Sequence, residues 1–249
     1  MSRRRLLVGL ALLAALVALA GCTGGTVDEQ ALAENATYDW NTSADATFDV
    51  GGDRSYQAVY TVDGQEEIAV YFEDGFTGKQ PVPISALKFR YPNGTVANAS
   101  AMEVSETNDE VVIGLPSDQG QVAYTTRTDT KSFRTPALVN GTYEVVLPPG
   151  MRVGVPILSD VKPGGYEAAV EADGRTHVRW DQIEEGDVVV RYYLQRDLYL
   201  FGGGIAALAL IAVAGLVYFR LQIRRLERQR ADAGLDLEES DDSDDSGLL

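Results

Sequence analysis

The chain has one cysteine and one histidine in 249 residues. The single cysteine, Cys22, cannot form an intramolecular disulfide, so packing and sheet pairing must stabilise the fold. The chain also lacks the ligands of a usual zinc site and the pair needed for a cysteine–histidine nucleophile. The histidine, His177, alternates with Val178 in a strand pattern, which indicates a hydrogen-bonded surface side chain. These shortages argue against metal binding and nucleophilic catalysis.

Other catalytic signatures are missing as well. The chain contains neither a Gly-Lys-Ser/Thr phosphate loop nor a nucleophile elbow. Its glycine run, residues 202–204, lies in an apolar segment and cannot cradle a phosphate. Paired carboxylates such as Glu184 and Glu185 are frequent in so acidic a chain, and no pair stands out. We therefore expect a protein that is not an enzyme and has no cofactor; an extracellular hydrolase with acidic catalytic residues is the least favoured alternative.

Lysine is scarce and acidic residues are abundant. The chain has four lysines, and residues 23–195 hold 27 acidic against 12 basic residues, a net charge of −15. This balance argues against nucleic acid as a partner. An acidic, lysine-poor surface is typical of proteins from concentrated salt, where the Debye length falls to ~3 Å at 1 M and self-repulsion is screened. A cation-binding surface is the alternative, although no ligand spacing supports it.

One long apolar run is present. Residues 198–219 contain no charged side chain, and at ~1.5 Å per helical residue they reach about 33 Å, enough to cross a hydrocarbon core of ~30 Å. A buried core helix is usually shorter. Five arginines between Arg220 and Arg230 follow the run, which by the positive-inside rule places the C-terminus in the cytoplasm and residues 22–195 outside the cell.

The N-terminus has the pattern of a signal peptide over residues 1–21. Three arginines precede an apolar run from Leu6 to Ala20, and small residues follow. The sequence Leu19-Ala20-Gly21-Cys22 resembles the lipobox of prokaryotic lipoproteins. This resemblance implies that Cys22 becomes a lipid-bearing N-terminus on the outer face. An incidental cysteine beside an ordinary cleavage site is the alternative.

Between the two membrane segments the pattern predicts a tether and then a β domain. Residues 22–53 are rich in Gly, Thr, Asn and Asp and are expected to be flexible. Residues 54–195 show alternating apolar residues and frequent turn signals, typical of a β-sandwich or two small sandwiches, with a candidate seam at 125–135. Asp63-Gly64 between two alternating runs predicts a hairpin.

Asparagine is concentrated in glycosylation sequons. Five of the six asparagines stand in Asn-X-Ser/Thr, although Ser and Thr total only 28 of the 249 residues. These candidate N-glycosylation sites are Asn35, Asn41, Asn93, Asn98 and Asn140. All five precede the apolar run and thus lie on the predicted external side. A compositional preference for Asn-Gly-Thr turns is the alternative explanation.

The last thirty residues, 220–249, divide into two parts. Residues 220–230 predict a short basic helix that could lie against anionic headgroups. The following acidic, serine-containing tail has too few apolar residues to fold.

The lipobox, the acidic sequon-rich β domain, the Arg191–Phe201 segment and the basic and acidic tail together resemble an uncharacterised family of haloarchaeal membrane-anchored surface proteins. Gly164–Tyr166 and Tyr192–Phe201 are the most distinctive parts. The resemblance implies an organism class and no activity. We expect a cell-envelope module that binds or scaffolds, with membrane lipids and other envelope proteins or glycans as partners. The alternative is an accessory or sensor subunit of a membrane complex that uses its cytoplasmic tail.

Overall fold

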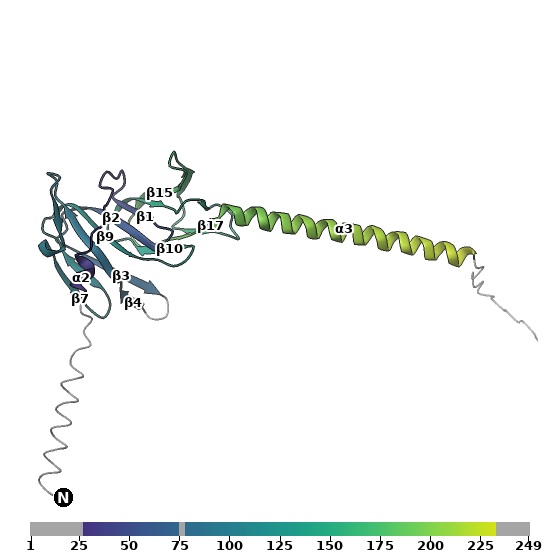
Figure 1. The fold of residues 1–249 in the computed structure, drawn as a ribbon, viewed down its shortest axis with the longest axis horizontal. Helices are drawn as coiled ribbons and strands as arrows, with labels where there is room; N and C mark the ends of the chain where they lie inside the picture. Colours follow the sequence, from purple (N-terminus) through teal and green to yellow (C-terminus); the bar gives the residue numbers. More distant parts are fainter. Residues whose placement is uncertain (1–26, 75–77, 233–249) are drawn as a thin grey trace, which may run out of the picture. The chain divides into compact units, whose positions relative to one another are not determined.

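A computed structural model describes residues 27–74 and 78–232 (Figure 1). Contacts divide the chain into two units, one ending at Gln195 and the other beginning at Arg196. In the described residues, the first unit is built of strands and the second is a long helix. The predicted signal peptide, the candidate lipid site Cys22 and the acidic tail from residue 233 onward lie outside the described residues.

The first unit, here called the β domain, confirms the prediction of a mainly β fold. Its strands are β1 (Ala46–Val50), β2 (Ser55–Asp63), β3 (Glu67–Asp74), β4 (Gly78–Pro81), β5 (Ile84–Arg90), β6 (Val96–Asn98), β7 (Glu103–Glu106), β8 (Val111–Gly114), β9 (Gln119–Arg127), β10 (Ser132–Pro136), β11 (Gly141–Val146), β12 (Met151–Arg152), β13 (Asp160–Lys162), β14 (Glu167–Val170), β15 (Thr176–Ile183), β16 (Asp187–Arg191) and β17 (Tyr193–Leu194). A helical turn, α2 (Glu29–Leu32), precedes them, and a 3-10 turn, η1 (Ala99–Ala101), follows β6.

One layer of the β domain is an eight-stranded sheet in the order β14-β15-β11-β1-β2-β9-β5-β6. Its β1–β11 pair is parallel, and the other pairs are antiparallel. Strand β1 shows why these residues pair: Ala46, Phe48 and Val50 alternate along it and are fully buried on one face.

The other layer consists of a four-stranded sheet, β4-β3-β8-β7, and a three-stranded sheet, β10-β16-β13. One continuous apolar core joins both layers. At its centre the ring of Phe48 from β1 lies 5.0 Å from that of Phe133 in β10 and 5.5 Å from that of Tyr60 in β2. The β domain is therefore a single sandwich, and the alternative of two small sandwiches is wrong.

Two segments predicted to be a hairpin turn and a domain seam instead connect the two layers of the sandwich. The predicted hairpin at Asp63-Gly64 does not form, because β2 pairs with β1 and β9 on its two edges, whereas β3 pairs with β4 and β8. The Asp63-Gly64 turn instead carries the chain from one layer to the other. Similarly, the candidate seam at 125–135 is no domain boundary; it is where the chain passes from β9 to β10, again between layers.

The strand registers define two ends of the β domain. The proximal end, named for its closeness to Gln195, contains the turns 51–55 and 127–132 and the loop 147–159: Thr128 N donates to Arg54 O, and Gln195 N donates to Gly150 O. Strand β2 begins there, with Ser55 opposite Arg127, and ends at the other, distal end with Asp63 opposite Gln119.

The predicted flexible tether over 22–53 is wrong for residues 27–53. Leu32 of α2 is buried in the core, and β1 is a central strand. Between them, Tyr38 packs on the outer face of the eight-stranded sheet, where its hydroxyl donates to Ala86 O at 2.8 Å and burial raises its pKa to about 12. Small residues beneath it, Ala86 and Ala123, leave room for the ring. This segment is thus part of the β domain.

The second unit contains α3 (Gln195–Asp232) apart from its first residue, and α3 includes the predicted span at 198–219. Its residues 195–230 are long and apolar enough to cross a membrane, with a mean hydropathy of 2.4 in the most apolar window and no buried residue there. The basic segment at 220–230, predicted as a short helix, is helical and continues α3 without a break. Good helix formers such as Leu, Gln, Arg and Glu explain this continuity.

Candidate functional site

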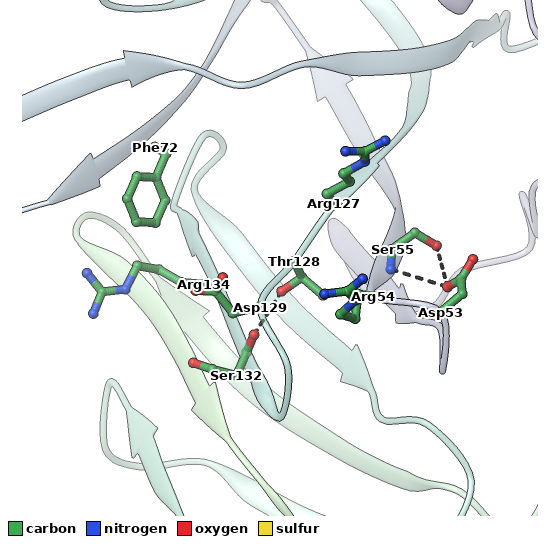
Figure 2. Close-up of a pocket in the computed structure, with 9 residues that line it drawn as sticks. All are labelled: Asp53, Arg54, Ser55, Phe72, Arg127, Thr128, Asp129, Ser132 and Arg134. Carbon is green, nitrogen blue, oxygen red and sulfur yellow. Dashed lines mark hydrogen bonds between the residues drawn. The ribbon is translucent and has the colours of Figure 1, made fainter.

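The proximal end of the β domain carries a groove of about 710 Å³ (Figure 2). It lies where β2 begins, where β9 ends, and beside β10 and β3. Its lining includes three arginines and one aromatic ring: Arg54, Arg127, Arg134 and Phe72. Such a mixture of guanidinium groups and an apolar wall suits an anionic ligand.

Local hydrogen bonds hold the two turns that present these arginines. Asp53 Oδ1 accepts from the hydroxyl of Ser55 at 2.7 Å and from its backbone N–H at 3.2 Å, and these bonds lower the pKa of Asp53. In the second turn, the hydroxyl of Thr128 donates to Ser132 O at 2.8 Å. Because Thr128 N also donates to Arg54 O, each turn fixes the other.

The backbone at this site is strained at two cationic residues. Arg54 has φ 65° and Lys131, in the turn 127–132, has φ 59°. This left-handed region costs a residue with a side chain about 1 kcal/mol and is normally taken by glycine or asparagine. Such outliers concentrate at functional sites, where the surrounding structure holds them in place.

The groove has a surplus of positive charge. Arg134 approaches Asp187 at only 4.0 Å, with both side chains well exposed. Within the described residues, neither Arg54 nor Arg127 has a carboxylate within 4.0 Å. Asp53 and Asp129 also line the groove, so its three arginines and two aspartates leave a net charge of +1. In a domain with a net charge of −15, this is an unusual concentration of cations.

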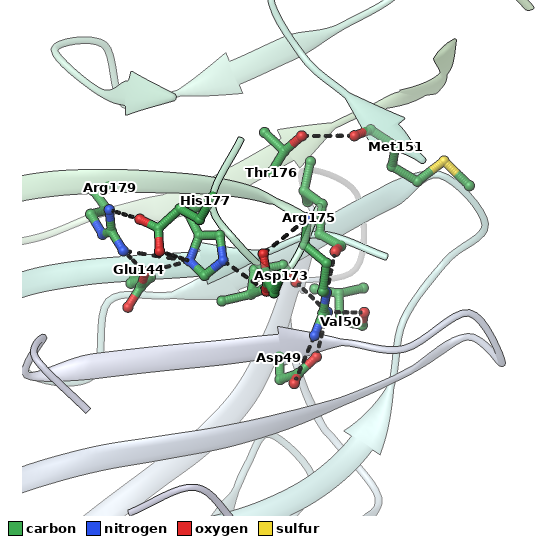
Figure 3. A network of polar contacts seen from close by, with 12 residues as sticks. Asp49, Val50, Glu144, Met151, Asp173, Arg175, Thr176, His177 and Arg179 are labelled. Carbon is green, nitrogen blue, oxygen red and sulfur yellow. Dashed lines mark hydrogen bonds and ion pairs between the residues drawn. The ribbon is translucent and has the colours of Figure 1, made fainter. Parts of the chain in front are cut away.

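A second cluster of charges lies on β11, β15 and the turn between β14 and β15 (Figure 3). His177 Nδ1 lies 2.7 Å from Glu144 Oε1, and its Nε2 lies 3.2 Å from Asp173 Oδ2. Arg179 donates to Glu144 at 2.6 Å and pairs with Glu171. Unlike the groove, this cluster pairs its opposite charges.

The pKa values follow from these contacts. Burial acts against the charged form of His177, but hydrogen bonds to Glu144 and Asp173 outweigh it and raise the pKa of His177. A hydrogen bond from Arg179 lowers the pKa of Glu171, and one from the backbone N–H of Arg175 lowers the pKa of Asp173. The cluster thus favours a protonated histidine beside ionised carboxylates.

The sequence correctly placed His177 on the polar side of its strand, with hydrogen-bond partners. It is less open than expected, since its side chain is only 12% exposed beneath the β14–β15 turn. Ligand atoms of Glu144, Glu171 and His177 lie within 4.8 Å of one another, close enough to hold a metal ion. However, Arg179 already pairs with both carboxylates, so a metal would have to displace a guanidinium group.

An arginine pairing also secures the proximal end near this cluster. Arg175 donates to both carboxylate oxygens of Asp49, at 2.6 and 3.0 Å, and to Leu147 O at 2.8 Å. It thereby ties the start of β15 to the ends of β1 and β11. The side chain of Arg175 is 19% exposed, so this bidentate pair is structural and is not presented for a ligand.

All five predicted glycosylation asparagines are exposed. Asn140 lies at the distal end, where the hydroxyl and backbone N–H of Thr142 donate to Asp45. Asn93 lies in the distal turn between β5 and β6. The other three follow the β5–β6 edge: Asn98 is in β6, opposite Lys88, whereas Asn35 and Asn41 adjoin residues whose carbonyls accept from Lys88 and Arg90.

Comparison with known proteins identifies a family whose model matches most of the chain. A model described as a family of unknown function (DUF5803) matches residues 42–238. No curated protein matches the chain. Among solved structures, it is similar to a provisionally described protease from Parabacteroides distasonis, with 14% identity, a TM-score of 0.31, and coverage of 60% of this chain and 39% of that one. This chain spans less than half of that protein, and so low a TM-score carries no argument about fold or activity.

Proposed function

The chain belongs to the DUF5803 family of unknown function, and from that premise we propose that it is a non-enzymatic, membrane-anchored surface protein of a halophilic archaeon. In this proposal α3 spans the membrane, the β domain lies outside the cell and the C-terminus lies in the cytoplasm. A lipid on Cys22 provides a second anchor on the outer face. The β domain is N-glycosylated, and its groove binds anionic groups of the cell envelope.

The surplus of cations in the groove supports this proposal. Arg54 and Arg127 are exposed, have no carboxylate partner in the described part of the chain, and extend from turns that hold each other in place. Guanidinium groups bind carboxylate, sulfate or phosphate groups through paired hydrogen bonds of roughly 1.5–3 kcal/mol each. Two arginines on turns that are bonded to each other can therefore bind one anionic partner together.

Crosslinking in native membranes tests the groove. With Phe72→benzoylphenylalanine in the full chain, we expect partner crosslinks that fall at least about tenfold when Arg54→Gln and Arg127→Gln are combined, because two charge-assisted hydrogen bonds are lost. Lys162→Gln, which removes an exposed cation outside the groove lining, is the matched control and should leave the yield unchanged. Equal yields in all variants would assign the crosslinks to non-specific contact.

Exposure of the sequons supports glycosylation, and mass spectrometry of the native protein tests it together with the lipid on Cys22. Asn140→Gln should remove one glycan and increase gel mobility. The control is Asn108→Gln, since Asn108 stands outside any sequon. An unmodified chain beginning at Met1 would contradict both modifications.

Topology is tested by cysteine labelling in a Cys22→Ser background. Ser117→Cys, at the distal end, should react with an impermeant maleimide in intact cells, whereas Ser246→Cys should react only after permeabilisation. The reverse pattern would refute an external β domain.

The continuity of α3 favours one second candidate. A helix that runs without a break to Asp232 links the outer β domain directly to the cytoplasmic segment. An accessory or sensor subunit would use this link to transmit partner binding. Deletion of residues 233–249 distinguishes the candidates: the sensor loses its partners while the β domain stays intact, and the surface module loses none.

A further inference from the structure

Ile157 is the most exposed large apolar side chain among the described residues, at 87%. In the β domain the next most exposed are Val170 at 52% and Val96 at 42%, and α3 itself shows no value above the 71% of Leu210. Exposing isoleucine fully to water forgoes roughly 1.5–3 kcal/mol of burial. A single exposed apolar side chain is common on protein surfaces, so Ile157 is informative through the loop that holds it and the charges near it.

The loop that carries Ile157 is built to present it. Val155 O accepts from the N–H groups of both Leu158 and Ser159, each at 2.8 Å, which closes a tight turn around Pro156 and Ile157. The buried hydroxyl of Ser159 locks this turn by donating to Val155 O and accepting from Gly154 N. Residues 153–159 also contain no charged side chain, so the whole tip is apolar or neutral.

The loop lies at the proximal end of the β domain. It follows β12, which pairs with β17, the last strand before α3 begins. It precedes β13, whose first residue, Asp160, lies opposite Arg191 at the end of β16. Gln195, the first residue of α3, donates to Gly150 O in the same 147–159 loop.

The cations of the groove lie at this same end. Ser132 lies opposite Arg191, and Lys131 O accepts from Tyr192 N. The turn 127–132 is therefore bonded to a residue three positions before the start of α3. The turn 51–55, with Arg54, is bonded to it. One end of the β domain therefore combines an exposed apolar tip with exposed arginines, the combination that suits the interface of an anionic bilayer.

We propose that the proximal end seats the β domain on the membrane: Ile157 inserts among the lipid headgroups, and Arg54 and Arg127 bind their anionic groups. This inference rests on the proposed function, because it requires α3 to span the bilayer. If α3 spans, its first residue is at the bilayer surface, and the proximal end is bonded to that residue. The bilayer is then the partner within reach, and its anionic headgroups complement the arginines.

The test places an environment-sensitive fluorophore at position 157 of the full chain. Ile157→Cys in a Cys22→Ser background is labelled and reconstituted into vesicles of equal parts phosphatidylcholine and phosphatidylglycerol. We expect a blue-shifted emission and quenching by a quencher carried on the lipid. Val96→Cys, an exposed valine at the distal end, is the matched control and should keep a water-like, unquenched emission.

A third probe separates this inference from the proposed function. Leu208→Cys lies within the apolar part of α3 and should be quenched whether or not the β domain is seated. Quenching at 208 but not at 157 overturns the seating and leaves the span intact. No quenching at 208 refutes the span itself. A blue shift at 157 without lipid quenching indicates a protein contact instead and also overturns the proposal.

Changes in lipid charge and in salt distinguish the apolar contribution of Ile157 from the electrostatic contribution of the arginines. In vesicles of phosphatidylcholine alone, or with Arg54→Gln and Arg127→Gln, we expect quenching at 157 to weaken several-fold. Raising the salt from about 0.1 M to 1 M should weaken it less, because guanidinium and headgroup oxygens in hydrogen-bond contact lie within the Debye length of ~3 Å. Quenching that depends on neither lipid charge nor the two arginines would refute the role of the arginines.

Discussion

The two ends of the β domain differ in charge and in the way their turns are made. The distal turns 63–67, 117–119 and 184–187 carry seven acidic residues and no basic one, whereas the proximal turns 51–55 and 127–132 carry three cations and two acids. At the distal end, positive φ angles are taken by glycines such as Gly64, Gly94 and Gly186. In the proximal turns 51–55 and 127–132, Arg54 and Lys131 take them, whereas the proximal loop 147–159 uses Gly150 and Gly154.

The two ends of the β domain thus suit different roles, the distal end solvation and the proximal end contact with an anionic partner. Acidic turns with glycine at the strained positions have no backbone strain and keep an exposed surface solvated. Cationic residues at left-handed positions reduce stability where glycine would not, which supports the proposal that their side chains bind a ligand. The negative net charge of the β domain thus coexists with a group of cations at its proximal end.

The largest effect is expected from Gly141→Ala at the distal end. Gly141 has φ 144°, and an added Cβ would lie 2.2 Å from Asp45 Oδ2. Strain and overpacking together should cost about 2–5 kcal/mol in the free energy of unfolding. Denaturant unfolding of the full chain in detergent measures this. The variant keeps the Asn140 sequon, so an unchanged glycan would show that the loss comes from packing.

A smaller loss is expected from Glu144→Ala in the paired cluster. Glu144 is buried, and its removal leaves His177 and Arg179 without their shared carboxylate. Because Arg179 remains half-exposed and keeps Glu171, we expect a cost of about 2 kcal/mol, below that of a fully buried pair. Glu167→Ala, on the exposed strand β14, is the control. Equal stability of both variants would mean that the cluster is solvated and not structural.

Arg54→Gly should increase the free energy of unfolding, whereas the two preceding substitutions decrease it. Because glycine adopts φ 65° without strain, the variant should gain about 0.5–1 kcal/mol of stability, reduced by the greater freedom of glycine in the unfolded chain. It should also lose binding in the groove. Arg127→Gln, within a strand, should lose binding without a gain in stability. If Arg54→Gly is less stable than the parent, the arginine is structural and the comparison of the two ends fails.

Local patterns were sufficient for part of this fold. Alternation predicted strands within residues 54–195, β15 among them, and the side of β15 on which His177 lies. The uncharged run predicted the apolar part of α3. The prediction of a hairpin at Asp63-Gly64 was wrong because both edges of β2 are occupied, by β1 and β9. A turn signal does not encode which strands pair. The prediction of a flexible tether was wrong because Tyr38 is buried against two alanines, Ala86 and Ala123, in strands remote in sequence.

The candidate site could not be predicted in the same way. Arg54 and Arg127 are brought together by the β2–β9 register, and neither stands in a motif. The exposed sequons were found because their three-residue pattern is local. For Ile157 a weak signal existed, since Gly154 and Pro156 mark a turn whose apolar neighbours have no strand to join.

The smallest effect should be a change in pH dependence caused by His177→Gln. The pKa of His177 is raised above its ordinary 6.5, so its contribution is complete below that value and is lost as pH rises through the raised pKa. Glu171 and Asp173 have lowered pKa values, so their contribution is lost as pH falls through those values, below 4.5 and 3.8. The parent should therefore exceed His177→Gln by up to about 1 kcal/mol near pH 5.5, and by less near pH 8.5. Thermal unfolding at the two pH values measures this, and a constant difference would show that His177 acts through packing and not through its charge.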